Sequence, residues 1–214
     1  MTPYYEQDGI TIYHGDCRGV LPTLRPQGAD LLLTDPPYGR STDTDYSRMT
    51  RSTKVYPPVV GDEELFNPSH LVAYPRVILW GANHYASQLP DSGGWLVWDK
   101  RAGRQASNNF SDAELAWCSF KTPVRVFRHL WGVNRASEQR DHLHPTQKPV
   151  ALMRWILEGW TEPGDLVLDP YMGSGPIAEA ARQTDRRYIG IEIEERYCEV
   201  AVKRLAQCAL DLSA

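Results

Sequence analysis

The chain has 214 residues, of which 42% are apolar and 23% charged, so it can form a single domain with its own core. Its net charge of -4 and pI near 5.9 are untypical of a basic nucleic-acid-binding domain. No signal-peptide pattern, no apolar run of membrane-spanning length and no CxxC cysteine pair is present, so we expect a cytoplasmic protein without membrane, metal or disulfide.

The first third of the chain predicts two strands and a helix. Residues 10–13 are predicted to form a strand and residues 17–24 a short helix. Residues 29–34 form a continuous apolar run, which is typical of a strand that is covered on both faces of a sheet. The polar segment that follows, residues 39–58, is predicted to be a mobile loop.

The remainder alternates strand-like and helix-like segments. Strands are predicted at 77–80, 95–98, 166–168 and 188–191, and helices at 149–159, 176–183 and 194–210. Segments 113–120 and 123–130 are predicted to pair as antiparallel strands, followed by an irregular polar segment. This alternation indicates an α/β domain with a mostly parallel sheet.

The first motif, Asp35-Pro36-Pro37-Tyr38, follows a buried strand at the sheet edge where α/β domains bind ligands. The prolines stiffen the turn and have no N–H, and an ionised aspartate only accepts hydrogen bonds. Rigid acceptors beside an aromatic ring suit a planar group that carries an NH2. Alone, the motif fits an ordinary Asp-Pro turn with a packed tyrosine equally well.

The second motif also places Asp-Pro and an aromatic after a strand, at Asp169-Pro170-Tyr171. Gly173 and Gly175 then allow a tight turn and close ligand approach, and Pro176 suits the first turn of a helix. An isolated GxG is a weak signal, because it also occurs in ordinary strand-to-helix turns.

Glu192 ends the next strand, seventeen residues after Gly175. An acidic residue at this spacing is the usual acceptor for ribose hydroxyls, although alone it fits a solvated strand end. With the glycine turn it favours a ribose-bearing ligand, and the absence of a full GxGxxG favours a ligand other than NAD.

Four ordered motifs together resemble the amino-group DNA methyltransferases: DPPY at 35–38, HPTQKP at 144–149, DPYMGSG at 169–175 and YIGIE at 188–192. More narrowly they resemble the permuted beta group of N6-adenine enzymes, in which the catalytic motif precedes the S-adenosylmethionine motif. The resemblance implies a Rossmann-like methyltransferase fold with a seven-stranded, mostly parallel sheet and helices on both faces. It also implies S-adenosylmethionine as cofactor and double-stranded DNA as substrate. Family members are often homodimers, and so compact a chain resembles solitary or phage-borne enzymes.

The resemblance carries roles onto matching residues. Asp35 and the Pro36 carbonyl would accept hydrogen bonds from the target amino group, with Pro37 completing the motif, and Tyr38 would stack on the flipped base. Residues implied in cofactor binding are Asp16 near the adenine, Thr146 and Lys148 at the methionine carboxylate, Asp169, Tyr171, Met172, Gly173 and Gly175 around the methionine and ribose, and Glu192 at the ribose hydroxyls. Pro176 replaces a common Thr, and Tyr171 a common Phe.

Charge is distributed unevenly along the chain. Residues 100–154 hold ten basic and four acidic side chains, a net +6, whereas residues 162–214 hold six and ten, a net -4. A local basic face is enough to contact phosphates. Candidate DNA contacts are Arg40, Arg48, Arg51, Lys54, Arg125, Arg128, Arg135 and Arg140. We expect loop 39–58 over the target base and a short target-recognition segment at 121–143, although any single arginine here can simply be solvated.

The resemblance favours a site-specific enzyme that methylates N6 of a flipped-out adenine without a metal. N4-cytosine methylation is the nearest alternative, and Asp35 favours adenine because the cytosine group more often has Ser there. An RNA or protein amine methyltransferase fits less well, because those enzymes more often have the cofactor motif first. A non-catalytic module that binds S-adenosylmethionine or DNA is the last alternative. Whether a restriction enzyme accompanies the protein is left open.

Overall fold

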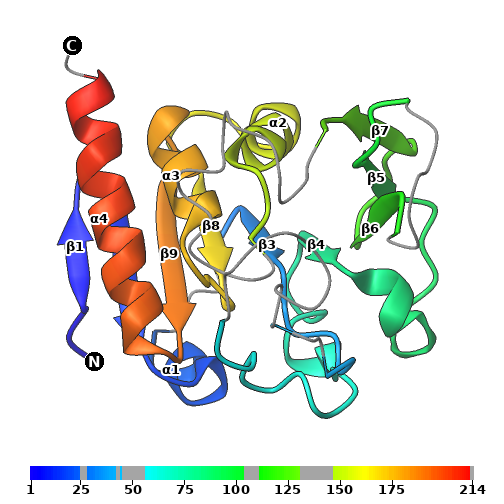
Figure 1. Cartoon of the computed structure of the whole chain (residues 1–214), viewed down its shortest axis with the longest axis horizontal. Helices are drawn as coiled ribbons and strands as arrows, with labels where there is room; N and C mark the ends of the chain where they lie inside the picture. Colours follow the sequence, from blue (N-terminus) through cyan, green and yellow to red (C-terminus); the bar gives the residue numbers. More distant parts are fainter. Residues whose placement is uncertain (25–27, 42–43, 45–55, 104–110, 131–146, 213–214) are drawn as a thin grey trace.

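A computed structural model describes residues 1–24, 28–41, 44, 56–103, 111–130 and 147–212, which form an α/β domain around one sheet (Figure 1). The strands are β1 (Tyr5–Gln7), β2 (Ile10–His14), β3 (Leu31–Thr34), β4 (Val77–Trp80), β5 (Trp95–Asp99), β6 (Ala113–Cys118), β7 (Arg125–Arg128), β8 (Leu166–Asp169) and β9 (Arg187–Glu192). The helices are α1 (Cys17–Leu24), α2 (Val150–Trp160), α3 (Pro176–Gln183) and α4 (Glu195–Leu212), with short 3-10 turns η1 (Pro68–His70), η2 (Ala82–His84) and η3 (Ala86–Gln88).

The strands lie in the order β1-β2-β9-β8-β3-β4-β6-β5-β7. All run in one direction except β1 and β6, so the prediction of a mostly parallel sheet is confirmed. The expected count of seven strands is wrong, because the described residues contain nine. One extra edge strand arises at Asp8 and Gly9, whose positive φ angles of 50° and 78° fit a tight hairpin that folds β1 onto β2.

The predicted antiparallel pairing of segments 113–120 and 123–130 is also wrong. β6 is hydrogen-bonded to β4 on one side and to β5 on the other, so neither of its edges is open. β7 instead pairs in parallel with the free edge of β5, with Leu96 opposite Arg125. Apolar periodicity predicts strands, but it does not say which edge is free.

Two apolar layers cover the sheet. Leu31 and Leu33 face the layer that contains α2, α3 and α4, whereas Leu32 faces the layer that contains α1 and the segment with η1 and η2. Because successive side chains of a strand point to opposite faces, the run at 31–33 has to be apolar throughout. α3 and α4 lie in front of the sheet in Figure 1.

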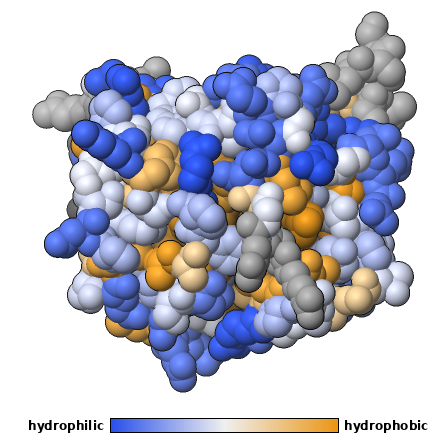
Figure 2. Space-filling view, turned by 180° about the vertical axis from the view of Figure 1, so that it is seen from behind, coloured by the Kyte–Doolittle hydropathy of each residue, from blue (hydrophilic) through white to orange (hydrophobic). Residues whose placement is uncertain are grey.

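Figure 2 shows the face of the molecule that points away from the viewer in Figure 1. It is mostly polar, and apolar side chains appear there between polar ones. Among the described helices, none combines the length and the apolar character needed to cross a membrane.

The centre of the sheet positions the candidate site. β9, β8 and β3 are parallel neighbours, so Glu192, Asp169 and Asp35 come to the same edge at their carboxyl ends. β3 is followed in the chain by β4 on one side of it, whereas β8 and β9 lie on the other side. Ligands of open α/β sheets bind at such a reversal of strand order.

Candidate active site

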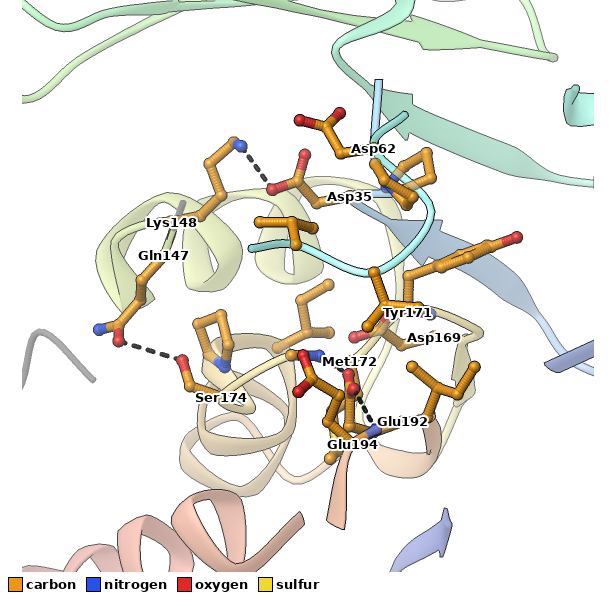
Figure 3. Close-up of a pocket in the computed structure, with 18 of the residues that line it drawn as sticks. Asp35, Asp62, Gln147, Lys148, Asp169, Tyr171, Met172, Ser174, Glu192 and Glu194 are labelled. Carbon is orange, nitrogen blue, oxygen red and sulfur yellow. Dashed lines mark hydrogen bonds and ion pairs between the residues drawn. The ribbon is translucent and has the colours of Figure 1, made fainter. Parts of the chain in front are cut away.

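A pocket opens at this edge, with about 840 Å³ of space including its mouth (Figure 3). Segments far apart in the sequence meet around it. Predicted site residues that line it are Asp35, Pro36, Pro37, Tyr38, Lys148, Asp169, Tyr171, Met172, Gly173 and Glu192. The fold therefore brings the first motif, the lysine of the HPTQKP motif, the second motif and the end of β9 into one cavity.

Asp35 lies directly after β3 and is held by two donors. Its Oδ1 accepts a hydrogen bond from the Tyr38 hydroxyl at 2.5 Å, and its Oδ2 is 2.5 Å from Lys148 Nζ. Burial raises the pKa of Asp35, and the nearby ammonium of Lys148 opposes that rise. Each oxygen retains a further lone pair, so the carboxylate can accept another hydrogen bond.

Tyr38 packs against the turn that follows β4. Its ring lies against His84, with centroids 5.0 Å apart and an interplanar angle of 31°. Gly81 has a φ of +68°, and a Cβ there would be 1.9 Å from Tyr38 Cε1, so only glycine leaves room for the ring. Burial raises the pKa of Tyr38 well above its ordinary value, which keeps its hydroxyl protonated as a donor to Asp35.

Asp62, which belongs to no sequence motif, fixes the backbone after the two prolines. Its Oδ1 accepts hydrogen bonds from the backbone N–H groups of Tyr38 at 3.0 Å, Gly39 at 2.8 Å and Arg40 at 3.2 Å. The carboxylate is buried. The arrangement resembles an anion-binding loop whose anion is supplied by the protein itself, and it holds Tyr38 in place.

Asp169 is fully buried at the end of β8. Its Oδ1 accepts from Thr34 Oγ1 at 2.6 Å, and its Oδ2 accepts from the Tyr188 hydroxyl at 2.9 Å. Burial raises the pKa of Asp169 to about 7, although these donors favour the ionised form. A buried carboxyl of this kind gains its charge readily when a cation binds beside it.

Glu192 ties the glycine turn to β9. Its Oε2 accepts from the Gly173 N–H and its Oε1 from the Glu194 N–H, both at 2.8 Å. Burial raises the pKa of Glu192. Gly175, at φ +78°, precedes α3 and would place a Cβ 2.8 Å from the Cβ of Ala201, so the turn is closely packed on α4.

Lys148 is almost completely buried, and its Nζ contacts Asp35 Oδ2. Its ammonium also contacts the Tyr38 hydroxyl at 3.1 Å and Glu114 Oε2 at 3.0 Å. The neighbouring Gln147 Oε1 accepts a hydrogen bond from Ser174 at 3.0 Å. Glu114, Gln147 and Ser174 were not predicted as site residues. Gln147 and Ser174 lie inside the HPTQKP and DPYMGSG motifs but were given no role, whereas Glu114 belongs to no motif.

Other predicted residues lie away from the pocket or outside the described residues. Asp16 caps the start of α1 through the Arg18 N–H at 2.9 Å and pairs with the Arg18 side chain. Gly15 and Arg18 line an adjoining hollow that shares Tyr171 and Glu192 with the main pocket. Arg40, Arg125 and Arg128 are exposed. Thr146, Arg48, Arg51, Lys54, Arg135 and Arg140 lie outside the described residues.

Within the described part of the chain, no group of three histidine, cysteine or acidic side chains is arranged to hold a metal ion. The pocket offers instead a rigid acceptor, an aromatic ring and buried carboxylates, side by side at the centre of a mostly parallel sheet. The fold and the site together define a class, the α/β proteins that bind a ligand at the switch point of the sheet.

The chain belongs to the DNA methylase family of N6 and N4 methyltransferases, whose sequence profile it matches over residues 95–203. It is 30% identical to YubD of Escherichia coli (strain K12), a protein named as a methylase, over 90% of this chain and 88% of that one. The protein is thus a DNA methyltransferase of the N6-adenine or N4-cytosine kind.

Solved structures show the same fold. The M1.HpyAVI–SAM complex matches with a TM-score of 0.55 and 24% identity, covering 92% of this chain and 98% of that one. The cytosine-N4-specific PvuII DNA methyltransferase matches with a TM-score of 0.61 and 15% identity, covering 94% and 88%. The predicted α/β methyltransferase fold is confirmed.

Proposed function

We propose that the protein transfers a methyl group from S-adenosylmethionine to N6 of a flipped-out adenine at specific sites in double-stranded DNA. The observation that carries the proposal is the Asp35 carboxylate, held between the Tyr38 hydroxyl and Lys148 beside a pocket with further carboxylates. The order along the chain, with Asp35 before Asp169, supports membership of the permuted beta group. We expect a cytoplasmic enzyme.

The pocket fits the cofactor. When bound, S-adenosylmethionine supplies a methyl group on a positively charged sulfur, and the carboxyl groups of Asp169, Glu192 and Glu194 suit such a cation. Asp169 and the turn at 173–175 would hold its methionine and ribose parts. Each oxygen of Glu192 accepts one backbone N–H and keeps a lone pair for a ribose hydroxyl.

Asp35 and the Pro36 carbonyl would then accept hydrogen bonds from the target amino group. The lone pair of that nitrogen is conjugated into the ring, and two acceptors on its hydrogens favour a form in which the lone pair is available. The methylated nitrogen must lose one proton, and we assign that proton to Asp35. Most of the acceleration comes from alignment and fixed dipoles, because the protein supplies no nucleophile.

The target base has to leave the duplex to reach this site, at a cost of a few kcal/mol of unstacking. Tyr38 would stack on the flipped base. Arg125 and Arg128, which are exposed on β7, are the proposed phosphate contacts among the described residues, and Arg40 would lie near the flipped nucleotide. Asp35 favours adenine over cytosine, because the resemblance associates serine at this position with N4-cytosine enzymes.

Product analysis tests the proposal. Purified protein is incubated with methyl-labelled S-adenosylmethionine and unmethylated DNA, and the DNA is digested and separated into nucleosides. Label in N6-methyladenine supports the proposal. Label in N4-methylcytosine moves the target to the alternative base, and the absence of any labelled nucleoside contradicts it.

A further inference from the structure

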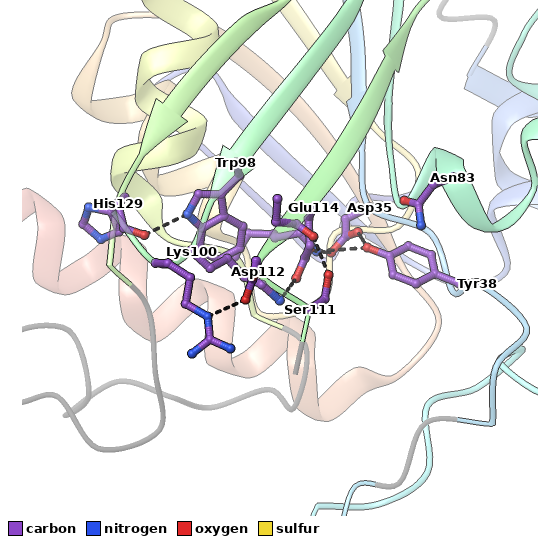
Figure 4. Close-up of polar contacts among 12 residues, drawn as sticks. Asp35, Tyr38, Asn83, Trp98, Lys100, Ser111, Asp112, Glu114 and His129 are labelled. Carbon is purple, nitrogen blue, oxygen red and sulfur yellow. Dashed lines mark hydrogen bonds and ion pairs between the residues drawn. The ribbon is translucent and has the colours of Figure 1, made fainter. Parts of the chain in front are cut away.

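A chain of alternating charges extends from Asp35 through Lys148 and Glu114 to Lys100, and Figure 4 labels Asp35, Glu114 and Lys100 of this chain. Asp35 contacts Lys148, Lys148 contacts Glu114 at 3.0 Å, and Glu114 Oε1 lies 3.0 Å from Lys100 Nζ. Glu114 is on β6 and Lys100 follows β5, so elements outside the four motifs contribute half of the chain. Two positive and two negative charges make the chain neutral overall.

The hydrogen bonds in this chain have a fixed direction. Lys148 donates hydrogen bonds to Asp35 Oδ2 and to the Tyr38 hydroxyl oxygen, and its ammonium forms an ion pair with Glu114 Oε2 at 3.0 Å. Because the Tyr38 oxygen accepts from Lys148, its own proton is free to point at Asp35 Oδ1. Glu114 therefore completes the arrangement that presents two donors to the catalytic carboxylate.

Glu114 itself is held strongly in its charged form. Burial disfavours that charge, but Lys148 and Lys100 outweigh it and lower the pKa of Glu114 to about 2. The negative charge of Glu114 in turn helps to raise the pKa of Asp35. Glu114 does not line the cofactor pocket.

Other groups around the chain are few among the described residues. His84 in η2 faces the ring of Tyr38. Arg40 and Asp62 lie close enough to His84 to influence its pKa, and Asp169 lies at the end of β8. Burial lowers the pKa of His84, so it is neutral near pH 7 and adds no charge there. Near neutral pH, Lys148 and Glu114 are thus the charges that act most directly on Asp35.

We propose that Glu114 is a positioning residue for methyl transfer, which orients Asp35 through Lys148 and, together with Lys100, sets how strongly Asp35 attracts the proton of the target amino group. The inference rests on the proposed function, because it assigns Glu114 to the same reaction. In the step concerned, the lone pair of the target nitrogen would form a bond to the methyl carbon while the bond from that carbon to the cofactor sulfur breaks, with its electron pair left on the sulfur as a neutral thioether. One N–H proton of the target amino group would move to the Asp35 carboxylate. A carboxylate paired with an uncompensated lysine would be a weaker acceptor of that proton.

Two substitutions predict opposite shifts. Glu114→Gln keeps the shape of the side chain but removes its negative charge, so the pKa of Asp35 falls. The acidic limb of the pH–rate profile then moves to lower pH by about one unit. Lys100→Met leaves the negative charge of Glu114 less neutralised, so the pKa of Asp35 rises. The acidic limb then moves to higher pH by a smaller amount. Because misplacement of a reacting group by about 1 Å can cost 10²-fold, we expect Glu114→Gln also to lower the maximal rate roughly tenfold or more.

The experiment measures the single-turnover rate of methyl transfer to DNA between pH 5.5 and 8.5, with saturating S-adenosylmethionine. Asp112→Asn is the matched control, because the Asp112 side chain precedes the same strand and pairs with Arg101 at 2.7 Å. Asp112 contacts Lys100 through its backbone carbonyl, which accepts from the Lys100 N–H at 2.9 Å and is kept in the variant. Asp112→Asn is expected to leave both the rate and the acidic limb unchanged. Calorimetry is expected to give a cofactor Kd within about twofold of wild type for all three variants.

Opposite shifts of the acidic limb in the two variants support the inference. An unmoved limb overturns it, even where Glu114→Gln lowers the rate, because a structural defect alone lowers the rate without moving the limb. Lys100→Met, at a partly exposed position, carries the test if Glu114→Gln does not fold. An active wild-type enzyme with unmoved limbs removes only this inference, whereas an inactive wild type removes the proposed function as well.

Discussion

At the residue scale, the pocket is lined by buried carboxyl groups, and each is stabilised by a different set of neighbours. Asp35 has a lysine and a tyrosine hydroxyl, whereas Asp169 has two hydroxyl donors and the Tyr171 N–H but no contacting cation among the described residues. Burial without a counter-charge is the reason that the pKa of Asp169 rises to about 7. The missing counter-charge is what a cationic cofactor would supply.

This difference predicts a pH-dependent affinity for S-adenosylmethionine. A cation binds better to ionised Asp169, so affinity should rise as pH increases through about 7 and binding should release a proton below that value. Calorimetry at pH 6 and pH 8, in two buffers of different ionisation enthalpy, measures both effects. Equal affinity at the two pH values, with no proton release at pH 6, would show that Asp169 is already ionised at pH 6 or takes no part in cofactor binding.

At the element scale, the sequence predicts those segments that local chemistry defines. α3 begins at Pro176 and ends at Gln183 as predicted, because Gly175 and Pro176 mark its start and its apolar face is periodic. The pairing of β7 with β5, and the contact of Asp62 with residues 38–40, join segments that no local pattern connects. The motif residues lie around one pocket, whereas the residues that hold the motifs in place emerged only from the structure.

Asp62 gives a prediction at this scale. Asp62→Ala removes the acceptor of three backbone N–H groups, which should lower the free energy of unfolding by about 1–3 kcal/mol. Because Tyr38 is then less well held, the rate of methyl transfer should fall more than cofactor affinity does. Thermal unfolding and single-turnover rates measure this, with the exposed neighbour Glu63→Ala as control. If the two variants have the same stability, the loop does not depend on Asp62.

At the scale of the whole molecule, bulk charge is a poor guide to the partner. The net charge of -4 hides a +6 segment, but Lys100 and Lys148 in that segment are paired internally with Glu114 and Asp35. Positive charge available to DNA is thus carried by side chains such as Arg125 on the exposed edge strand β7. Arg128 Nε lies 3.7 Å from Asp99 Oδ2, so part of the positive charge of Arg128 is already neutralised by the protein.

Salt dependence tests this placement. Arg125→Ala should weaken DNA binding and reduce the magnitude of the slope of log K against log salt concentration by about one. The reason is that DNA binding releases fewer counterions when one phosphate contact is lost. Arg128→Ala should have a smaller effect. Lys203→Ala on α4, which is also exposed and next to an acidic side chain, is the control. Slopes that match wild type for Arg125→Ala would place the DNA on another face.

The central claim is that the carboxylate of Asp35 acts on the target amino group and takes no part in holding the cofactor. Asp35→Ala tests it most directly, with the rate of methyl transfer to DNA and the Kd for S-adenosylmethionine measured on the same preparation. The account predicts that transfer falls by at least about 10²-fold while the Kd remains close to that of wild type. Turnover near the wild-type rate would contradict it.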